Sequence, residues 1–302
     1  MQSAKLMTAA GVLALGLAGP ALAREPGVPT SMPVGGTMGV PVGASPPPGL
    51  YLSSRTGFAE FSLYDENSDE VGVDLSVRDT AFQFIWVPGT KLWGGDYKAL
   101  TTIPLLSIDQ TLSAGLGGGQ ADRLSFGQIE VRPLDVSWQV EPGIFVSTGV
   151  SVFAPTGNWS ASEAVNTQGN FWTVAPSVGF SYLRDGWNAS LHAIYFTNTR
   201  NNDNDYKSGD ELVVNMTALK DVGGWSIGPV GYWRKQITED DNNGSAFGGG
   251  TAGKAEQLGL GLGVTRRIGA AELNVNFTKD IEHKNTVAGD RLWVNVTLPL
   301  GK

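Results

Sequence analysis

The sequence predicts an all-β protein, a transmembrane antiparallel up-and-down β-barrel of about twelve strands. Three observations predict it. Apolar residues recur at every second position from Leu50 onward, and short and long connections alternate along the chain. No segment after the amino terminus approaches the roughly 20 apolar residues that a membrane-spanning helix needs. Strands are therefore expected to form the membrane-spanning part.

The two-residue period is clearest near the carboxy terminus. In residues 258–265, 271–278 and 291–298, one parity is apolar and the other is polar, small or charged. A helix would scatter these residues around its axis, because its repeat is 3.6 residues. Alternation also explains an ordinary mean hydropathy of −0.07. The predicted strands are 50–64, 71–87, 96–108, 123–140, 143–154, 170–183, 187–197, 210–220, 225–238, 255–267, 270–280 and 290–300.

The connections alternate between tight turns and long polar stretches. Membrane barrels do this because their periplasmic turns are short and their extracellular loops are long. A soluble β-sandwich with a buried apolar face is the alternative, but it has no reason to keep this order. Tight turns are expected at 185–186, 221–224 and 268–269, and long loops at 156–170, 198–208 and 239–254.

The amino-terminal residues predict export. In residues 1–23 one Lys precedes an apolar run, and Ala21-Leu22-Ala23 ends it with small residues, which is typical of a signal peptide cleaved after Ala23. An uncleaved anchor is the alternative. Residues 24–49 are rich in Pro and Gly and are interpreted as a periplasmic lead-in, with a plug inside the lumen as the alternative. Residues 50–302 would form the barrel.

A closed sheet in hydrocarbon needs an apolar outside and can have a polar inside. The apolar parity of each strand is therefore assigned to lipid and the polar parity to the lumen. In residues 71–87 the apolar parity shifts near Asp79, and a β-bulge is expected there. Trp86, Trp187 and Trp225 are expected in interfacial aromatic belts. The predicted lumen-lining residues are Asp74, Arg78, Gln128, Glu130, Arg132, Asn188, His192, Asn215, Arg234, Gln236, Glu272, Asn274, Asn276, Arg291 and Asn295.

Composition excludes several function classes. A formal charge of −8 argues against nucleic acid as a partner, and the absence of Cys argues against a disulfide scaffold. Residues 248–253 match G-x-G-x-x-G but lack the strand and helix that a dinucleotide site needs, so a loop is expected. The acidic loop residues fit no dedicated calcium loop, and neither a metal nor a cofactor is predicted.

His192 is the one candidate for catalysis. An outer-membrane phospholipase would need a Ser/His/Asn arrangement that reaches lipid. His192 shares its parity with Asn188 and Ser190, which is the polar face, so it is expected in the lumen. The sequence is therefore interpreted as that of a protein that is not an enzyme.

Several short motifs in the barrel resemble a known family. They are Ala154-Pro155-Thr156-Gly157, the Asn198–Asp210 region with its Asp and Ser-Gly-Asp residues, and Gly228-Pro229-Val230-Gly231-Tyr232 followed by Gln236 and Asp240. Together they resemble the outer-membrane protein family named for involvement in the meta-pathway of phenol degradation. The order and spacing of these motifs carry the likeness, over roughly residues 50–300.

That resemblance implies a channel or transporter in the bacterial outer membrane for small hydrophobic or aromatic compounds. Its partners would be the lipid bilayer, small organic solutes and the barrel-assembly machinery. The chain departs from the usual barrel terminus, because it ends Leu300-Gly301-Lys302 rather than in an aromatic residue. A structural or adhesion barrel whose extracellular loops bind a partner is the alternative function.

Overall fold

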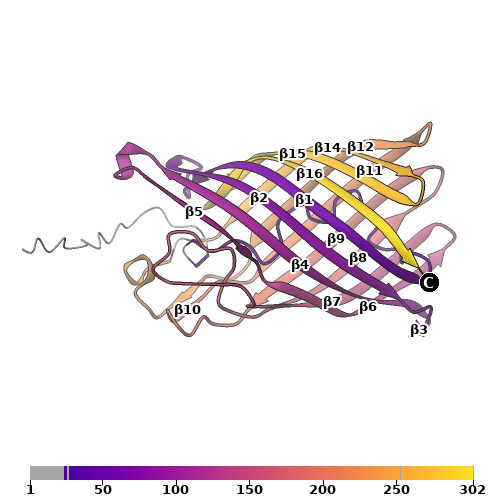
Figure 1. Cartoon of the computed structure of the whole chain (residues 1–302), viewed down its shortest axis with the longest axis horizontal. Helices are drawn as coiled ribbons and strands as arrows, with labels where there is room; N and C mark the ends of the chain where they lie inside the picture. Colours follow the sequence, from indigo (N-terminus) through magenta and orange to yellow (C-terminus); the bar gives the residue numbers. More distant parts are fainter. Residues whose placement is uncertain (1–23, 26, 252, 302) are drawn as a thin grey trace, which may run out of the picture.

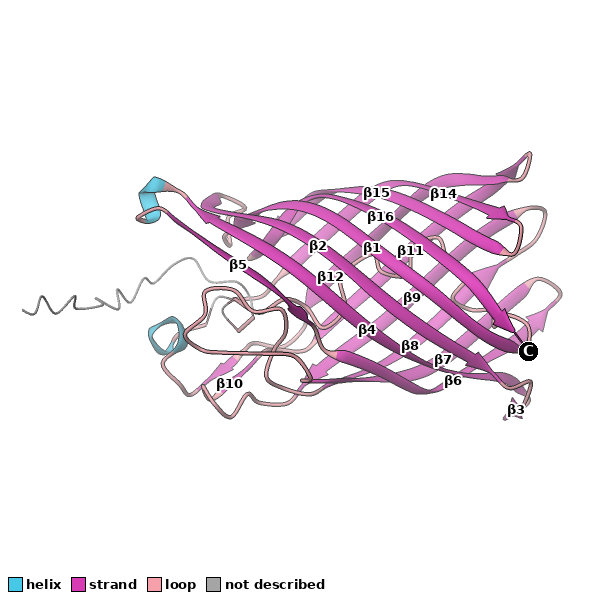
Figure 2. Cartoon of the chain, viewed as in Figure 1, coloured by secondary structure: helices cyan, strands magenta, loops and turns pink. Residues whose placement is uncertain are grey.

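The computed structural model describes residues 24–25, 27–251 and 253–301, so the predicted signal peptide lies outside the described residues. Long tilted strands surround a lumen, and the long loops gather at one end (Figures 1 and 2). The barrel strands are β1 (Gly49–Tyr64), β2 (Glu70–Val87), β4 (Gly95–Leu112), β6 (Ile129–Glu141), β7 (Ile144–Ala154), β8 (Thr173–Tyr182), β9 (Trp187–Asn198), β11 (Glu211–Val222), β12 (Trp225–Gln236), β14 (Glu256–Ile268), β15 (Ala271–Lys284) and β16 (Thr286–Gly301).

The sheet closes through its first and last strands. β1 pairs with β16 in an antiparallel register that runs from Tyr51 opposite Pro299 to Tyr64 opposite Thr286. Closure removes both sheet edges, so backbone hydrogen bonds are satisfied within the protein, as hydrocarbon requires. The predicted twelve-strand antiparallel barrel is confirmed. Within the described residues, no helix is long and apolar enough to cross a membrane.

The smaller elements lie at the two ends. β3 pairs with β4 beside the short turns, while β10 and β13 form a separate two-stranded sheet that joins two long loops. β5 pairs with β4 only. These elements are β3 (Lys91–Leu92), β5 (Gly119–Phe126), β10 (Tyr206–Lys207), β13 (Asp241–Asn242) and the 3-10 turns η1 (Ala114–Leu116) and η2 (Ala246–Gly249).

The predicted strand 123–140 is two strands in the structure. β5 and β6 both pair with β4, and Gly127 and Gln128 separate them. The Gln128 Nε2 group donates to the carbonyl of Phe171 at 2.6 Å, so its side chain is bound inside the barrel. Alternation continues on both sides of this break, but the apolar parity changes from Leu124 and Phe126 to Ile129 and Val131, a signal that the single predicted strand overlooked.

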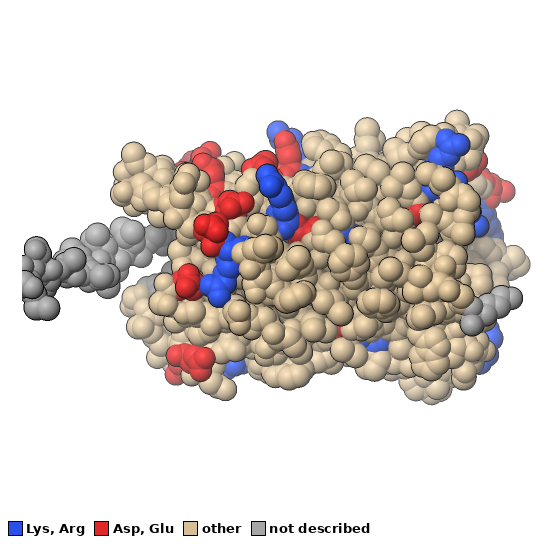
Figure 3. Space-filling view, in the orientation of Figure 1, with Lys and Arg blue, Asp and Glu red and all other residues tan. Residues whose placement is uncertain are grey.

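The outside of the barrel carries a broad apolar band. Phe82, Phe84 and Trp86 are exposed, and Trp187 and Trp225 are exposed beside short turns, as expected for an aromatic belt. Figure 3 shows that charged side chains on the visible face gather toward the two ends of the barrel. This distribution matches a membrane-spanning middle and polar rims.

Strand β2 corrects the predicted bulge. Its pairing with β1 and β4 runs without a shift from Asp74 to Trp86, so the same parity faces inward throughout. Asp74 and Arg78 are therefore on the outer face and exposed, and their assignment to the lumen is wrong. The cause is the length of β2, because its first half lies at the long-loop end, where charged side chains gather.

The inward residues of that half form a small apolar core of their own. Leu75 and Val77 pack against a cluster of Leu106, Ile108 and Val165, the last of which belongs to the 155–172 loop. The apolar parity thus changes faces along β2 because its surroundings change, without any irregularity of the backbone. Apolar side chains meet lipid near the short turns and a loop-covered core near the long loops.

Candidate functional site

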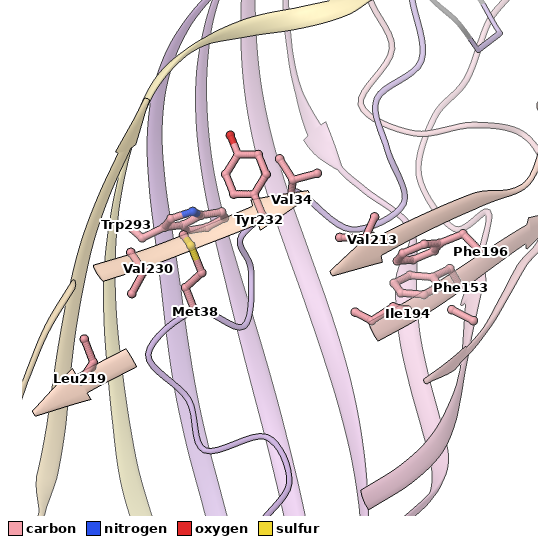
Figure 4. Packing of buried hydrophobic residues seen from close by; sticks show 11 residues of the cluster. Val34, Met38, Phe153, Ile194, Phe196, Val213, Leu219, Val230, Tyr232 and Trp293 are labelled. Atoms are coloured by element: carbon pink, nitrogen blue, oxygen red, sulfur yellow. The ribbon is translucent and has the colours of Figure 1, made fainter. Parts of the chain in front are cut away.

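Residues 27–48, here called the lumen segment, run inside the barrel. Of the two placements left open by the sequence, the structure has this stretch in the lumen rather than outside it as a periplasmic lead-in. Val34 and Met38 are buried in a cluster with Val230, Tyr232 and Trp293 of the wall. Figure 4 shows Met38 beside Trp293 and Val230, and Val34 beside Tyr232. Apolar burial in the lumen explains the placement.

Short polar side chains of the wall bind the backbone of the lumen segment. The Gly35 N–H donates to Oδ1 of Asn215 at 3.0 Å, and the Gly39 N–H donates to Oγ1 of Thr217 at 2.9 Å. These bonds satisfy backbone groups that have no sheet partner. The wall residues bonded to the segment include Ser137, Ser147, Ser181, Asn188, His192, Asn215, Thr217 and Asn276.

Glycines let the segment lie close to the wall. Gly39 has a φ of +81°, and a Cβ on it would come within 2.0 Å of Nδ2 of Asn274. A Cβ on Gly43 would lie 2.6 Å from the backbone nitrogen of Ser181. Only glycine fits these two positions without displacement. The Gly-rich composition of residues 24–49 therefore serves close packing.

Arg24 and Glu25, which precede the lumen segment, are held at the long-loop end by buried charged and polar groups. Glu211 accepts from both Arg234, at 2.5 and 3.2 Å, and Arg24, at 3.4 Å. The Glu25 carboxylate accepts from the side-chain amides of Asn201 and Asn204, both at 2.6 Å. The chain thus passes from the long-loop rim at Arg24, through the lumen, to β1 at the short-turn rim.

Two carboxyl groups in this region have raised pKa values. Burial raises the pKa of Glu25, and hydrogen bonds from Asn201 and Asn204 oppose the shift. Burial likewise raises the pKa of Asp240, which accepts from the Tyr206 hydroxyl and from the Gly209 N–H. Protonation of either group is therefore favoured in the folded protein relative to an exposed carboxyl.

A cavity of about 1140 Å³ lies beside the lumen segment. Wall residues from β1, β2 and β4 line it, and the segment contributes residues such as Pro33 and Val40. Its lining reaches Pro299 near the short turns and Ala164 in a long loop. The cavity thus has lining residues from both ends of the barrel.

Charged side chains within the cavity are largely paired. Asp135 lies 2.7 Å from Nε of Arg132 and 3.4 Å from Nζ of Lys98. Asp79 and Arg291 form a second pair, at 3.5 Å. Pairing of this kind offsets part of the cost of removing charges from bulk water.

The predicted lumen residues other than Asp74 and Arg78 point inward. Each lines the cavity, is buried, or bonds to the lumen segment, which includes the half-buried Asn188 and Glu272. His192 is buried, and its Nδ1 lies 3.2 Å from the hydroxyl of Thr37 in the lumen segment. It therefore faces the lumen, as its parity predicts.

Sequence reasoning missed several inward charges. Arg55, Asp79, Lys98 and Asp135 line the cavity but were not among the predicted residues. Parity could have found Arg55, which shares the inward side of β1 with Ser53. Asp79 was missed because the expected bulge lay at this residue, so parity did not assign it to a face.

The acidic loop residues find protein partners. Asp205 and Asp241 both form ion pairs with Arg200, the first at 2.9 Å. Across the part of the chain that the structure describes, no three His, Asp or Glu side chains are grouped to hold a metal ion.

A family model matches residues 61–296, and its description is "Putative MetA-pathway of phenol degradation". The chain belongs to this family. The closed β-barrel is also the fold that the resemblance implied. No relative is found among the curated proteins.

Two solved structures share the fold. The COG4313 outer membrane channel from Pseudomonas putida F1 superimposes with a TM-score of 0.71 and 15% identity, over 85% of this chain and 97% of that one. The transport unit of the autotransporter AIDA-I from Escherichia coli gives a TM-score of 0.51 and 10% identity, over 83% and 89%. At these identities the likeness is one of fold.

Proposed function

We propose that this protein is an outer-membrane channel for the uptake of small, mostly apolar organic molecules, including aromatic ones. The observation that carries the proposal is the cavity beside the lumen segment. Its volume of about 1140 Å³ exceeds that of typical small-ligand pockets, which is roughly 300–1,000 Å³. Much of its lining is apolar, as with Leu100, Pro104 and Ile194.

The lumen segment suits a selective route. Most of its hydrogen bonds to the wall go to strands from β6 to β15, and the cavity is lined by β1, β2 and β4 together with Phe153 of β7 and Ile194 of β9. A twelve-strand barrel lies between the filled eight-strand and the open sixteen-strand cases, so a narrowed path is expected. Family membership supports the same solute class, because the family description refers to phenol degradation.

Uptake by reconstituted protein tests the proposal. Liposomes containing the purified protein are given labelled phenol or benzoate, and ion current is recorded across planar bilayers. We expect solute uptake above that of protein-free liposomes, together with a small conductance. If uptake and current both equal those of the protein-free membrane, the channel function is wrong.

A further inference from the structure

Two guanidiniums that line the cavity are unpaired within the described residues, and they differ in exposure: Arg267 is exposed to solvent, whereas Arg55 is partly buried. Arg55 projects from β1 into the cavity, and among the residues described its side chain has neither a hydrogen bond nor an ion pair. The group lies against the lumen segment, since a Cβ on Gly36 would be 3.6 Å from its Nη1 atom. Arg55 thus carries a positive charge inside the barrel with no fixed partner.

The nearby carboxylates are already engaged. Glu130 is the acidic group that acts on Arg55, but its two oxygens accept from the hydroxyls of Thr102, at 2.7 Å, and Ser151, at 2.6 Å. Asp135 is shared between Lys98 and Arg132. Neither carboxylate is within ion-pair distance of Arg55.

The local charge is therefore positive. Arg55, Lys98 and Arg132 all act electrostatically on His192, so these cations surround one region of the cavity. Glu130 and Asp135 are the carboxylates among them. Three cations face two anions, which leaves one positive charge, and an unpaired charge away from bulk water is costly. A single negative charge from a ligand would offset it.

Apolar side chains flank the same region. Leu100 and Pro104 stand on either side of Thr102 on the inward face of β4, and Phe153 follows Ser151 on β7. Ile194 follows His192 in the same way on β9. A ligand with its charge at Arg55 would therefore have apolar surface to contact. Inorganic anions cannot use that surface.

We propose that Arg55 is the anchor of a binding site for organic monocarboxylates whose hydrocarbon part is aromatic or short and aliphatic. The guanidinium fork matches a carboxylate in two parallel hydrogen bonds, which a neutral alcohol cannot form. The hydrocarbon part lies toward the β4, β7 and β9 side chains. This proposal deepens the proposed function, because it names the preferred class of solute for the same cavity.

Binding to the detergent-solubilised protein tests the site without transport. Isothermal titration calorimetry compares benzoate with benzyl alcohol, acetate and inorganic phosphate. We expect benzoate to bind more tightly than all three, and Arg55→Gln to weaken benzoate by roughly 10- to 100-fold, the loss of a charge-assisted pair. Arg55→Lys should restore part of the affinity. Arg78→Gln, which removes an equal charge from the outer face of β2, is the matched control and should change nothing.

Each other result has a distinct meaning. Equal affinities for benzoate and benzyl alcohol, or equal loss of both in Arg55→Gln, would show that Arg55 recognises no carboxylate. Phosphate bound as tightly as benzoate would reduce the site to a general anion site and overturn the organic part. If benzoate binds as expected but liposomes show no uptake, the channel function fails and the site remains. If uptake occurs without carboxylate preference, only the site fails.

Discussion

The two sides of the lumen are built differently. The side formed by β8, β9 and β11 presents small hydroxyls and amides, such as Ser181, Asn188 and Thr217, each bonded to the backbone of the lumen segment. The side formed by β1, β2 and β4 presents apolar and charged side chains, such as Val77 and Arg55, and lines the cavity, which Phe153 of β7 and Ile194 of β9 also border. The first side binds the lumen segment, and the second side lines the cavity.

This difference separates two roles of side chains in the barrel interior, which are binding of a peptide backbone and binding of small solutes. Short hydroxyl and amide groups suit an unpaired backbone, which needs an acceptor for each N–H and a donor for each C=O. Larger apolar and charged groups suit small solutes, which bring their own apolar surface and charge. If this division is correct, changes on the two sides should have separable effects.

Removing the lumen segment should have the largest effect. Deletion of residues 27–47 removes most of the lumen segment from the barrel. We expect conductance to rise by roughly an order of magnitude, toward that of an open barrel. Deletion of residues 243–250, in the loop between β13 and β14, is the control and should leave conductance near the native value. Unchanged conductance after the first deletion would mean that the segment does not limit permeation. Single-channel recording measures both variants.

Narrowing the cavity side should have the next largest effect. Ala81 lines the cavity from β2, so Ala81→Trp places a large ring in the space. We expect uptake of benzoate to fall several-fold while the fold is kept, because one added ring fills much of a small-ligand volume. Thr80→Trp adds the same ring on the outer face of β2 and should not reduce uptake. Equal effects of the two changes would contradict a route along β2.

The strands were predictable because alternation reflects a physical constraint that acts on every residue of a closed sheet. Even there, β2 misled the assignment of Asp74 and Arg78. Parity reports only that two faces differ, and the apolar face changes where lipid ends and a loop-covered core begins. Leu75 and Val77, which precede Asp79 on β2, face inward and pack against Leu106 and Val165, which are distant in the sequence.

The lumen segment was less predictable. Its backbone bonds go to side chains such as Asn215 and Asn276, more than 170 residues away. A Pro- and Gly-rich stretch has no periodicity that reports such contacts. The Gly content carried the signal, because Gly39 permits an approach that a Cβ would block. Parity could have placed Arg55 on the inward face. It could not have shown that Arg55 lacks a partner, because that follows from the positions of the other side chains in the lumen.

A smaller effect is expected from adding a side-chain atom where the lumen segment lies closest to the barrel wall. Gly39→Ala adds a Cβ against Asn274 at a positive φ, and we expect a loss of about 1–3 kcal/mol in unfolding free energy. Gly269→Ala has a similar φ of +60° but open space around its Cβ, so it reports backbone strain alone. Chemical unfolding in detergent compares the two. A loss no greater at Gly39 than at Gly269 would mean that the close approach to Asn274 contributes nothing.

The smallest expected effect is a pH dependence at the amino end of the lumen segment. Because burial raises the folded-state pKa of Glu25, the folded protein keeps this proton at pH values where the unfolded chain has lost it. Stability from Glu25 is therefore greatest in acid and falls as pH rises through its folded pKa. Lowering the pH from about 7 to about 5 should thus hold the segment more firmly against Asn201 and Asn204.

Hydrogen exchange of residues 27–44, corrected for the intrinsic rate at each pH, measures this attachment. Glu25→Gln keeps an acceptor oxygen for the two asparagine amides but removes the buried charge. We expect it to slow exchange at neutral pH and to flatten the pH dependence, with a residual slope from Asp240, whose pKa is also raised by burial. Glu163→Gln, at an exposed loop position, should leave the profile unchanged. Faster exchange in acid than at neutral pH would reverse the sign and show that the Glu25 charge holds the segment in place.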